Sequence, residues 1–144
     1  MTWRLARTRI AAILAAIEIT DPTDANILRV YETPPATVED APCFIIYPPA
    51  LKTERAGGGL RIKTYTVRMR CLVADEAVDR AADLVDAFRE AVVDAFDVDL
   101  TLAGTVTHIV GPDVEEARGW LFGREFVGMD FLLTVTVKEP RAFA

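Results

Sequence analysis

The sequence has 144 residues, a length that suits one domain with a hydrophobic core of its own. It is 51% apolar and 26% charged, as in ordinary globular proteins, and no apolar run approaches the roughly 20 residues of a membrane-spanning helix. Its net charge of −6 is unevenly spread: residues 1–74 carry 10 Lys/Arg and 7 Asp/Glu (net +3), and residues 75–144 carry 6 and 15 (net −9). The acidic half argues against a general nucleic-acid binder, whereas two patches of opposite sign favour head-to-tail contacts between copies.

The first element is predicted to be a helix over residues 2–19, which ends at Asp21-Pro22. Its apolar stripe recurs at helical spacing and consists of Leu5, Ile10, Ile13, Leu14 and Ile17. The following residues 21–41 are rich in turn-forming types, with a possible short strand at "ILRVY". "PCFIIYPP" is an apolar run bracketed by prolines and predicts a buried strand.

A basic segment, residues 50–63, separates this strand from the next. It contains Gly57, Gly58 and Gly59, and three successive glycines have too much backbone freedom to hold one conformation unaided. We therefore predict a mobile loop, which carries the cations Lys52, Arg55, Arg61 and Lys63.

The strand after this segment, "YTVRMRCLV", alternates between an apolar face and a face with Thr66, Arg68 and Arg70. Leu60 and Ile62 have the opposite parity, so either a bulge or the edge of the mobile loop is expected near Thr64. Cys43 and Cys71 both fall in apolar strand patterns and are interpreted as buried thiols, although their spacing leaves a disulfide possible.

A second helix is predicted over residues 76–97, capped by Asp75. Its inner stripe consists of Ala77, Ala81, Leu84, Val85, Phe88, Val92, Ala95 and Phe96. Its outer face is acidic and carries Asp79, Asp83, Asp86, Glu90 and Asp94.

Two further strand regions complete the chain. In the first, Leu100, Leu102, Val106, His108 and Val110 share a parity, which predicts a strand or a hairpin that turns at Ala103-Gly104. In the second, the odd-numbered positions from Val127 to Val137 are apolar, and Asp130, Thr134 and Thr136 face the other way. Gly123 and Gly128 predict bends or a close backbone approach. The expected fold is therefore α+β: a single domain, residues 1–144, with a mostly antiparallel sheet of about four strands and two helices packed on one face.

The residues favour no catalytic chemistry. There is no serine, and His108 is the only histidine. The triple glycine is followed by a strand and lacks the Gly-Lys-Ser/Thr and helix of a phosphate-binding loop. Asp97 and Asp99 form the one carboxylate pair that an enzyme might use with a metal ion, and a solvated turn is the favoured interpretation. We predict no enzyme activity, no cofactor and no bound metal.

The order of elements resembles the tail terminator family of long-tailed phages, with its tail-completion and minor tail relatives. The similar features are "TWRLARTRIAAIL", "RVYETPP", "APCFIIYPP", the basic segment, "YTVRMRCLV", the Asp-led helix and "WLFGREFVGMDFLLTVTV". They span most of the chain, and the resemblance lies in their order, because none is a specific motif.

The resemblance implies a structural virion protein, assembled in the bacterial host cytoplasm, that forms a ring, usually a hexamer. Such a ring caps the tail tube, ends its polymerisation and offers a docking surface to the head-completion or neck protein, while DNA passes through its channel without sequence-specific binding. The implied partners are thus other copies of the chain, the tail tube protein and the neck protein, and no membrane.

From the charge pattern we expect the subunit and tube contacts at the following residues: Lys52, Arg55, Gly57, Gly58, Gly59, Arg61, Lys63, Arg68, Arg70, Asp79, Asp83, Asp86 and Glu90. Three alternatives stay open. They are a head-completion or neck connector of the same virion, a small cytosolic α+β ligand-binding or regulatory domain that dimerises through its sheet, and an enzyme that uses Asp97 and Asp99.

Overall fold

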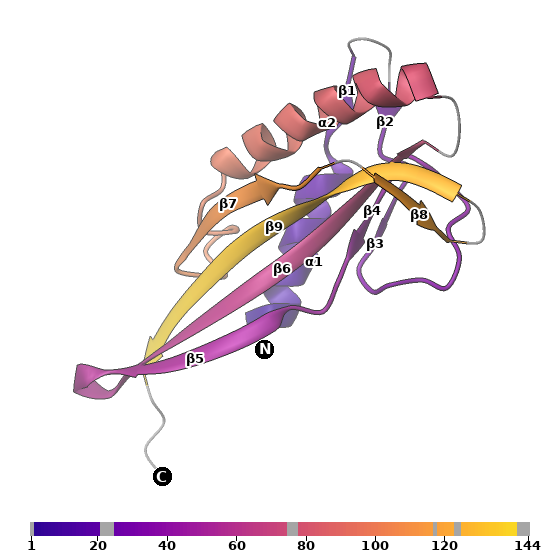
Figure 1. The fold of residues 1–144 in the computed structure, drawn as a ribbon. Coiled ribbons are helices and arrows are strands. Elements are labelled where there is room, and N and C mark those ends of the chain that lie inside the picture. The colour runs from indigo at the N-terminus through magenta and orange to yellow at the C-terminus, as the bar shows by residue number, and fades with distance from the viewer. Residues whose placement is uncertain (1, 21–24, 75–77, 117, 123–124, 141–144) are drawn as a thin grey trace.

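The computed structural model describes residues 2–20, 25–74, 78–116, 118–122 and 125–140 (Figure 1). Its two helices are α1 (Thr2–Ala15) and α2 (Val78–Asp97). Its strands are β1 (Glu18–Ile19), β2 (Ala25–Asn26), β3 (Arg29–Tyr31), β4 (Cys43–Ile46), β5 (Ala50–Ala56), β6 (Leu60–Ala74), β7 (His108–Val114), β8 (Arg118–Leu121) and β9 (Glu125–Pro140). No helix in the described part of the chain is long and apolar enough to cross a membrane.

The main sheet has seven strands, so the prediction of about four is wrong, although the fold is α+β. Its central path is β3-β4-β6-β9-β7, with β5 added to β6 and β8 added to β9, while β1 and β2 form a separate small sheet. The sheet is also mixed, because β3 and β4 run parallel and the other pairs are antiparallel. The uncounted strands β3, β5 and β8 are short or polar. They are stabilised by pairing with a longer neighbour and not by an alternating apolar pattern of their own.

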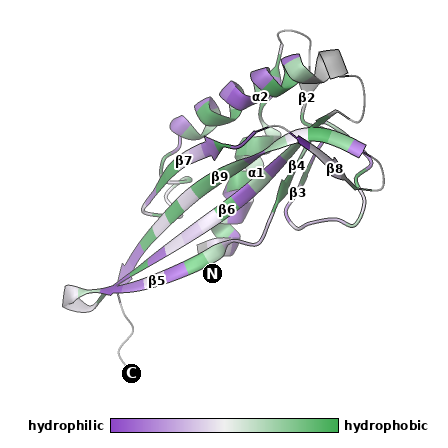
Figure 2. Ribbon diagram, in the orientation of Figure 1, coloured by the Kyte–Doolittle hydropathy of each residue, from purple (hydrophilic) through white to green (hydrophobic). Residues whose placement is uncertain are grey.

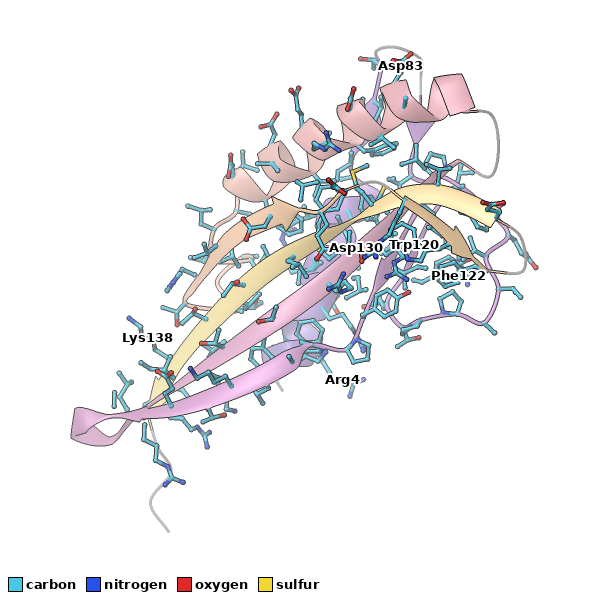
Figure 3. All side chains as sticks on the ribbon, in the orientation of Figure 1. Arg4, Asp83, Trp120, Phe122, Asp130 and Lys138 are labelled. Carbon is cyan, nitrogen blue, oxygen red and sulfur yellow. The ribbon has the colours of Figure 1, made fainter. Side chains whose placement is uncertain are left out.

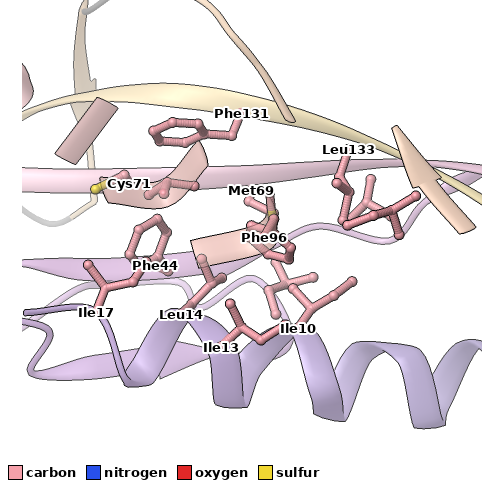
Figure 4. Close-up of a cluster of buried hydrophobic side chains, with 14 of the residues drawn as sticks. Ile10, Ile13, Leu14, Ile17, Phe44, Met69, Cys71, Phe96, Phe131 and Leu133 are labelled. Atoms are coloured by element: carbon pink, nitrogen blue, oxygen red, sulfur yellow. The ribbon is translucent and has the colours of Figure 1, made fainter. Parts of the chain in front are cut away.

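Both helices contribute to one hydrophobic core with the same face of this sheet (Figure 4). The α1 side chains in this core are Ala6, Ile10, Ile13 and Leu14, with Ile17 just after the helix. Leu5, predicted to be in the stripe, is 60% exposed, and Ala6 is buried instead. Leu5 precedes Ile10 by five residues, about 140° around a helix, whereas Ala6 precedes it by four and lies on the same side.

The inner stripe of α2 agrees with the prediction where its side chains are described: Leu84, Val85, Phe88, Val92 and Phe96 are buried, and Ala95 packs against them. The predicted cap Asp75 and the stripe residue Ala77 lie outside the described residues, as does the side chain of Ala81.

The two long strands β6 and β9 alternate as predicted. Val67, Met69 and Cys71 face the helices from β6, and Phe131 and Leu133 do so from β9. The pairing is regular from Leu60 to Leu72, so the bulge expected near Thr64 is absent, and the irregularity lies between Leu72 and Ala74. Leu60 and Ile62 keep the regular register. They lie on the face of the sheet opposite the two helices, called the helix-free face below, and beyond the part of the sheet that packs against the hydrophobic core.

Gly128 makes the close backbone approach that the sequence predicted. It pairs with Leu72 in the β6–β9 ladder, and a Cβ placed on Gly128 would lie 1.9 Å from the carbonyl oxygen of Cys71. Any side chain there would push the two central strands apart. Gly123, the other glycine predicted at a bend, lies outside the described residues.

The segment after α2 departs from its predicted pattern. Residues 98–107 form turns with positive φ at Leu102, Ala103 and Gly104, and β7 begins only at His108. Ile109 is buried, whereas Val110 is 59% exposed. The shared face predicted for Leu100 to Val110 is therefore wrong, because the turn changes the parity before the strand begins.

The two cysteines lie on neighbouring strands but on opposite faces. Cys43 pairs with Leu72 and Cys71 with Phe44, so side chains at adjacent register positions point to different sides of the sheet. Both are buried and neither forms a disulfide. Burial raises the pKa of the Cys43 thiol to about 12, which keeps it protonated at neutral pH.

Candidate functional site

The basic segment 50–63 forms a regular β-hairpin where a loop was predicted. Strand β5 pairs with β6 from Ala50 opposite Thr66 to Ala56 opposite Leu60. The turn is a short 3-10 segment, Gly57–Gly59, in which Gly58 and Gly59 take φ values of 77° and 76°. The glycines therefore supply the left-handed conformations of a tight turn, and they do not make the whole segment a loop.

This hairpin belongs to a three-stranded arm, because the same part of β6 also pairs with β9 as far as Leu60 opposite Pro140. The arm extends from the sheet beyond the ends of both helices (Figure 1). Hydrophilic residues predominate toward its tip (Figure 2). The arm is thus a hydrogen-bonded extension of the central sheet.

The cations of the arm are divided between its two faces. Arg55, Arg61 and Lys63 share the face of Tyr65, on the helix side, and Lys52 lies on the other face with its ion-pair partner Glu54, 3.0 Å away. Glu139 of β9 accepts hydrogen bonds from both Lys63, at 3.0 Å, and Arg61. These hydrogen bonds lower the pKa of the Glu139 carboxyl.

Arg55 forms no ion pair with any described residue. The helix side of the arm thus has three cations and one carboxylate near its tip, and this excess of positive charge is available to a partner.

The acidic residues of α2 lie on the side of the helix that faces away from the sheet, as the position of Asp83 illustrates (Figure 3). Asp83, Asp86 and Glu90 are exposed, and Asp86 has a weak ion pair with Arg89 at 3.5 Å. The side chain of Asp79 lies outside the described residues. The hairpin tip and this helix face lie apart in the subunit (Figure 1), so the structure does not bring the two predicted patches together within one chain.

Arg68 and Arg70, predicted as partner contacts, instead neutralise a buried acid within the subunit. Asp130 of β9 is 0% exposed and lies on the helix-free face of the sheet. Arg70 donates to its two carboxylate oxygens, Nε to Oδ1 at 2.8 Å and Nη2 to Oδ2 at 3.1 Å, and Arg68 also donates to Oδ2. Arg68 in turn contacts Glu115 at 3.2 Å, which leaves only part of its charge for a partner.

Two aromatic rings complete this cluster. The Arg70 guanidinium lies 4.2 Å from the ring centroid of Trp120 and 4.9 Å from that of Tyr47, whose hydroxyl accepts a hydrogen bond from Arg70 Nη1 at 3.0 Å. Trp120 also packs on a second small core of Val38, Cys43, Ile45, Leu72 and Phe126 (Figure 3). The cluster therefore fixes β8 and the segment before β4 to the helix-free face.

The charge balance of the cluster favours an ionised Asp130. Burial raises the pKa of the carboxyl, but the hydrogen bonds and charges of Arg70 and Arg68 lower it by more, so the net shift is downward. The same hydrogen bond to Asp130 raises the pKa of Arg68. Asp130 and Arg68 are thus both charged at neutral pH.

The two carboxylates of the rival enzyme interpretation have different surroundings. Asp99 accepts hydrogen bonds from Arg9 Nε at 2.7 Å and from the Ala103 amide at 2.8 Å, and Asp97 is exposed. The Ala103 amide and Arg9 hold the pKa of Asp99 low, and this acid closes the turn after α2. His108 is half-buried at the start of β7, on the helix-free face, and so does not share the core face predicted for it. Within the described residues, no group of three metal-ligating side chains is close enough to hold an ion.

Sequence reasoning missed the roles of Asp130, Glu115, Tyr47 and Trp120. One signal was present: an aspartate between Met129 and Phe131 interrupts an apolar run, and the neighbouring strand has two arginines of one parity. What the pattern lacked was the register that places Asp130 directly opposite Arg70. No family model matches this sequence, and no curated protein matches it.

Proposed function

We propose that this chain is a structural virion protein that assembles head to tail into a ring, caps a phage tail tube and presents a docking surface to the head. The observation that carries the proposal is the three-stranded arm, which projects beyond the helices and carries near its tip Arg55, a cation that has no ion pair with a described residue. The resemblance of the predicted order of elements to that of tail terminators favours the same function.

An arm of this kind suits assembly more than catalysis. Strands β5, β6 and β9 are hydrogen-bonded along the projection, so the arm is stiff compared with a loop and loses less conformational entropy on binding. Its charges lie on side chains that the subunit itself only partly neutralises. The opposite charge is on the outer face of α2, where Asp83 and Glu90 form no ion pair with a described residue. Contact between these surfaces requires a second copy.

The first expected outcome concerns assembly. The 15.9 kDa subunit should form closed rings, alone at high concentration or on tubes polymerised from the tube protein encoded in the same gene cluster. Raising the salt concentration from 0.1 M to 1 M should weaken the rings, because the Debye length falls from about 10 Å to about 3 Å and exposed charge pairs are screened. Sedimentation and negative-stain electron microscopy would measure both effects. Monomers under every condition, with no protein at the tube ends, would refute the proposal.

The second expected outcome concerns the arm. Deleting residues 55–61 and joining Glu54 to Ile62 through Asn-Gly keeps the strand register and replaces the turn with a two-residue hairpin connection. The shortened protein should melt within a few degrees of the parent, because the deleted residues contribute nothing to the hydrophobic core. It should nevertheless fail to close rings or to limit tube length.

A matched control separates length from charge. The variant Arg55→Gln with Arg61→Gln keeps the whole hairpin and removes two cations. If the charges carry the contact, it should assemble as poorly as the deletion. If tubes formed with the shortened protein have normal length and still join heads, the arm is a passive projection. Binding to heads without binding to tubes would favour the neck-connector alternative.

A further inference from the structure

A groove of about 470 Å³ lies between α1 and α2, at the end of α2 that leads into the turn. Alanines from both helices form its sides, and a Leu or longer apolar side chain could enter the space that they leave. Its lining is Arg9, Ala12, Ile13, Ala16, Ile17, Glu18, Ala91, Asp94, Ala95 and Val98. Val98 is 87% exposed at one end. The groove therefore offers apolar surface that the subunit leaves uncovered.

The charged rim of this groove is negative. Arg9 is already paired with Asp99 at 2.7 Å, and this leaves Glu18 and Asp94 as the uncompensated charges. Neither carboxylate forms an ion pair with a described residue. An occupant that suits this groove thus needs an apolar side chain and a nearby cation.

Strand β5 has both of these features on one face. Leu51, Thr53 and Arg55 alternate on the helix side of the arm, and Leu51 is 53% exposed although it lies opposite Tyr65 in the ladder. Arg55 has no ion pair with any described residue. Strand β5 also forms the edge of its sheet, with β6 as its partner, so one side of its backbone is open to a neighbour.

We infer that the groove between α1 and α2 receives strand β5 of a second copy of this chain, with Leu51 between the alanines of the groove and Arg55 beside Asp94. The inference rests on the proposed self-assembly and names the surfaces that would meet. Leu51 and Arg55 are about 13 Å apart along an extended strand. The groove residues Ala91 to Val98 extend about 10 Å along α2. Asp94 lies within this length, about 4.5 Å from Ala91 along the axis, so the long Arg55 side chain would meet it by extending back along the groove.

The contact is of the heterologous kind. The arm and the groove are different surfaces of the same chain, so each copy uses its arm on one neighbour and its groove on the other. Repetition of such a contact closes a ring when the rotation that relates neighbouring copies is a whole-number fraction of a full turn. This gives two exposed apolar parts of the described chain, the Leu51 side of the arm and the groove, a common role.

The test uses two variants that each add one cysteine, Leu51→Cys and Ala95→Cys, in the otherwise intact chain. Native Cys43 and Cys71 are both 0% exposed and do not compete for oxidation. When the two variants are mixed under mild oxidation, a disulfide-linked dimer of one Leu51→Cys chain and one Ala95→Cys chain should form in clear excess. Thr66→Cys is the matched control, because Thr66 is exposed on the opposite face of the same hairpin and should not cross-link to Ala95→Cys.

A charge exchange provides an independent measurement. Asp94→Arg and Arg55→Glu should each weaken association by about tenfold, the effect of roughly one lost ion pair. The double variant should recover most of the loss. Rings that form without the Leu51–Ala95 cross-link and without this recovery would overturn the groove contact and leave the proposed function intact. Failure of the unmodified protein to associate at all, with no cross-link, would overturn both.

Discussion

Replacing Asp130 with alanine should lower the free energy of unfolding by about 3 kcal/mol, the lower end of the range for removing one partner of a buried ion pair. The carboxylate is completely buried and accepts hydrogen bonds from both Arg68 and Arg70. Without it, Arg70 keeps a positive charge at 15% side-chain exposure with only Tyr47 and Trp120 beside it. Arg68 is 37% exposed and can turn toward water, which is why the upper end of the range is not expected.

Chemical denaturation at pH 7 would measure this loss, and two variants serve as controls. Asp130→Asn keeps the shape of the side chain and removes its charge, so it should be destabilised by less than the alanine variant. Glu125→Ala removes an exposed acid from the same strand and should change the stability by no more than about 0.5 kcal/mol. Equal stability of Asp130→Ala and the parent would show that the arginines do not depend on this acid.

The contribution of Asp130 should also depend on pH in a defined direction. Its folded-state pKa is lowered, so its stabilisation is complete above the unfolded-state pKa of about 3.9 and is lost as the pH falls below it. The stability difference between the parent and Asp130→Asn should therefore be constant from pH 7 to pH 5 and should shrink below pH 4. A difference that already shrinks between pH 7 and pH 5 would contradict the lowered pKa.

Phe131→Ala should lower the free energy of unfolding by about 3–5 kcal/mol, because it leaves a cavity in the centre of the main core. Phe131 is completely buried, and its ring lies 6.4 Å from that of Phe44 in a tilted arrangement (Figure 4). Phe88 of α2 contacts the same Phe44 ring edge-on at 6.4 Å, so Phe88→Ala should cost a similar amount. Either loss is a large share of the 5–15 kcal/mol that stabilises a typical domain.

The melting temperature should fall by roughly 10–20 °C for either phenylalanine variant. Val110→Ala is the control, since Val110 is apolar and in a strand but 59% exposed, and its melting temperature should change little. The loss of stability in the double variant Phe88→Ala with Phe131→Ala should differ from the sum of the two single losses, because both rings share Phe44 as a neighbour. Unchanged melting of both single variants would mean that these side chains are not in the core.

The sequence by itself determined the elements whose pattern is local. The amphipathic spacing of Ile10 to Leu14 and of Leu84 to Phe96 predicted α1 and α2, although the first helix ends at Ala15 and not at residue 19. Strict alternation in β6 and β9 predicted their core faces. A close approach at Gly128 followed from a glycine within an apolar strand. These features depend on helical and strand periods, and those periods are visible along the chain.

Tertiary structure alone decided how these elements meet. Strand β5 is polar and exposed, so only its pairing with β6 turns the predicted loop into a hairpin. Asp130 and Arg70 are 60 residues apart, and the register of β6 with β9 is what makes them a buried ion pair. The groove of α1 and α2 likewise exists only because the two helices pack on one face of the sheet. Each of these depends on contacts between distant residues, and hydrophobic periodicity, being a local property, carries no information about which distant residues those are.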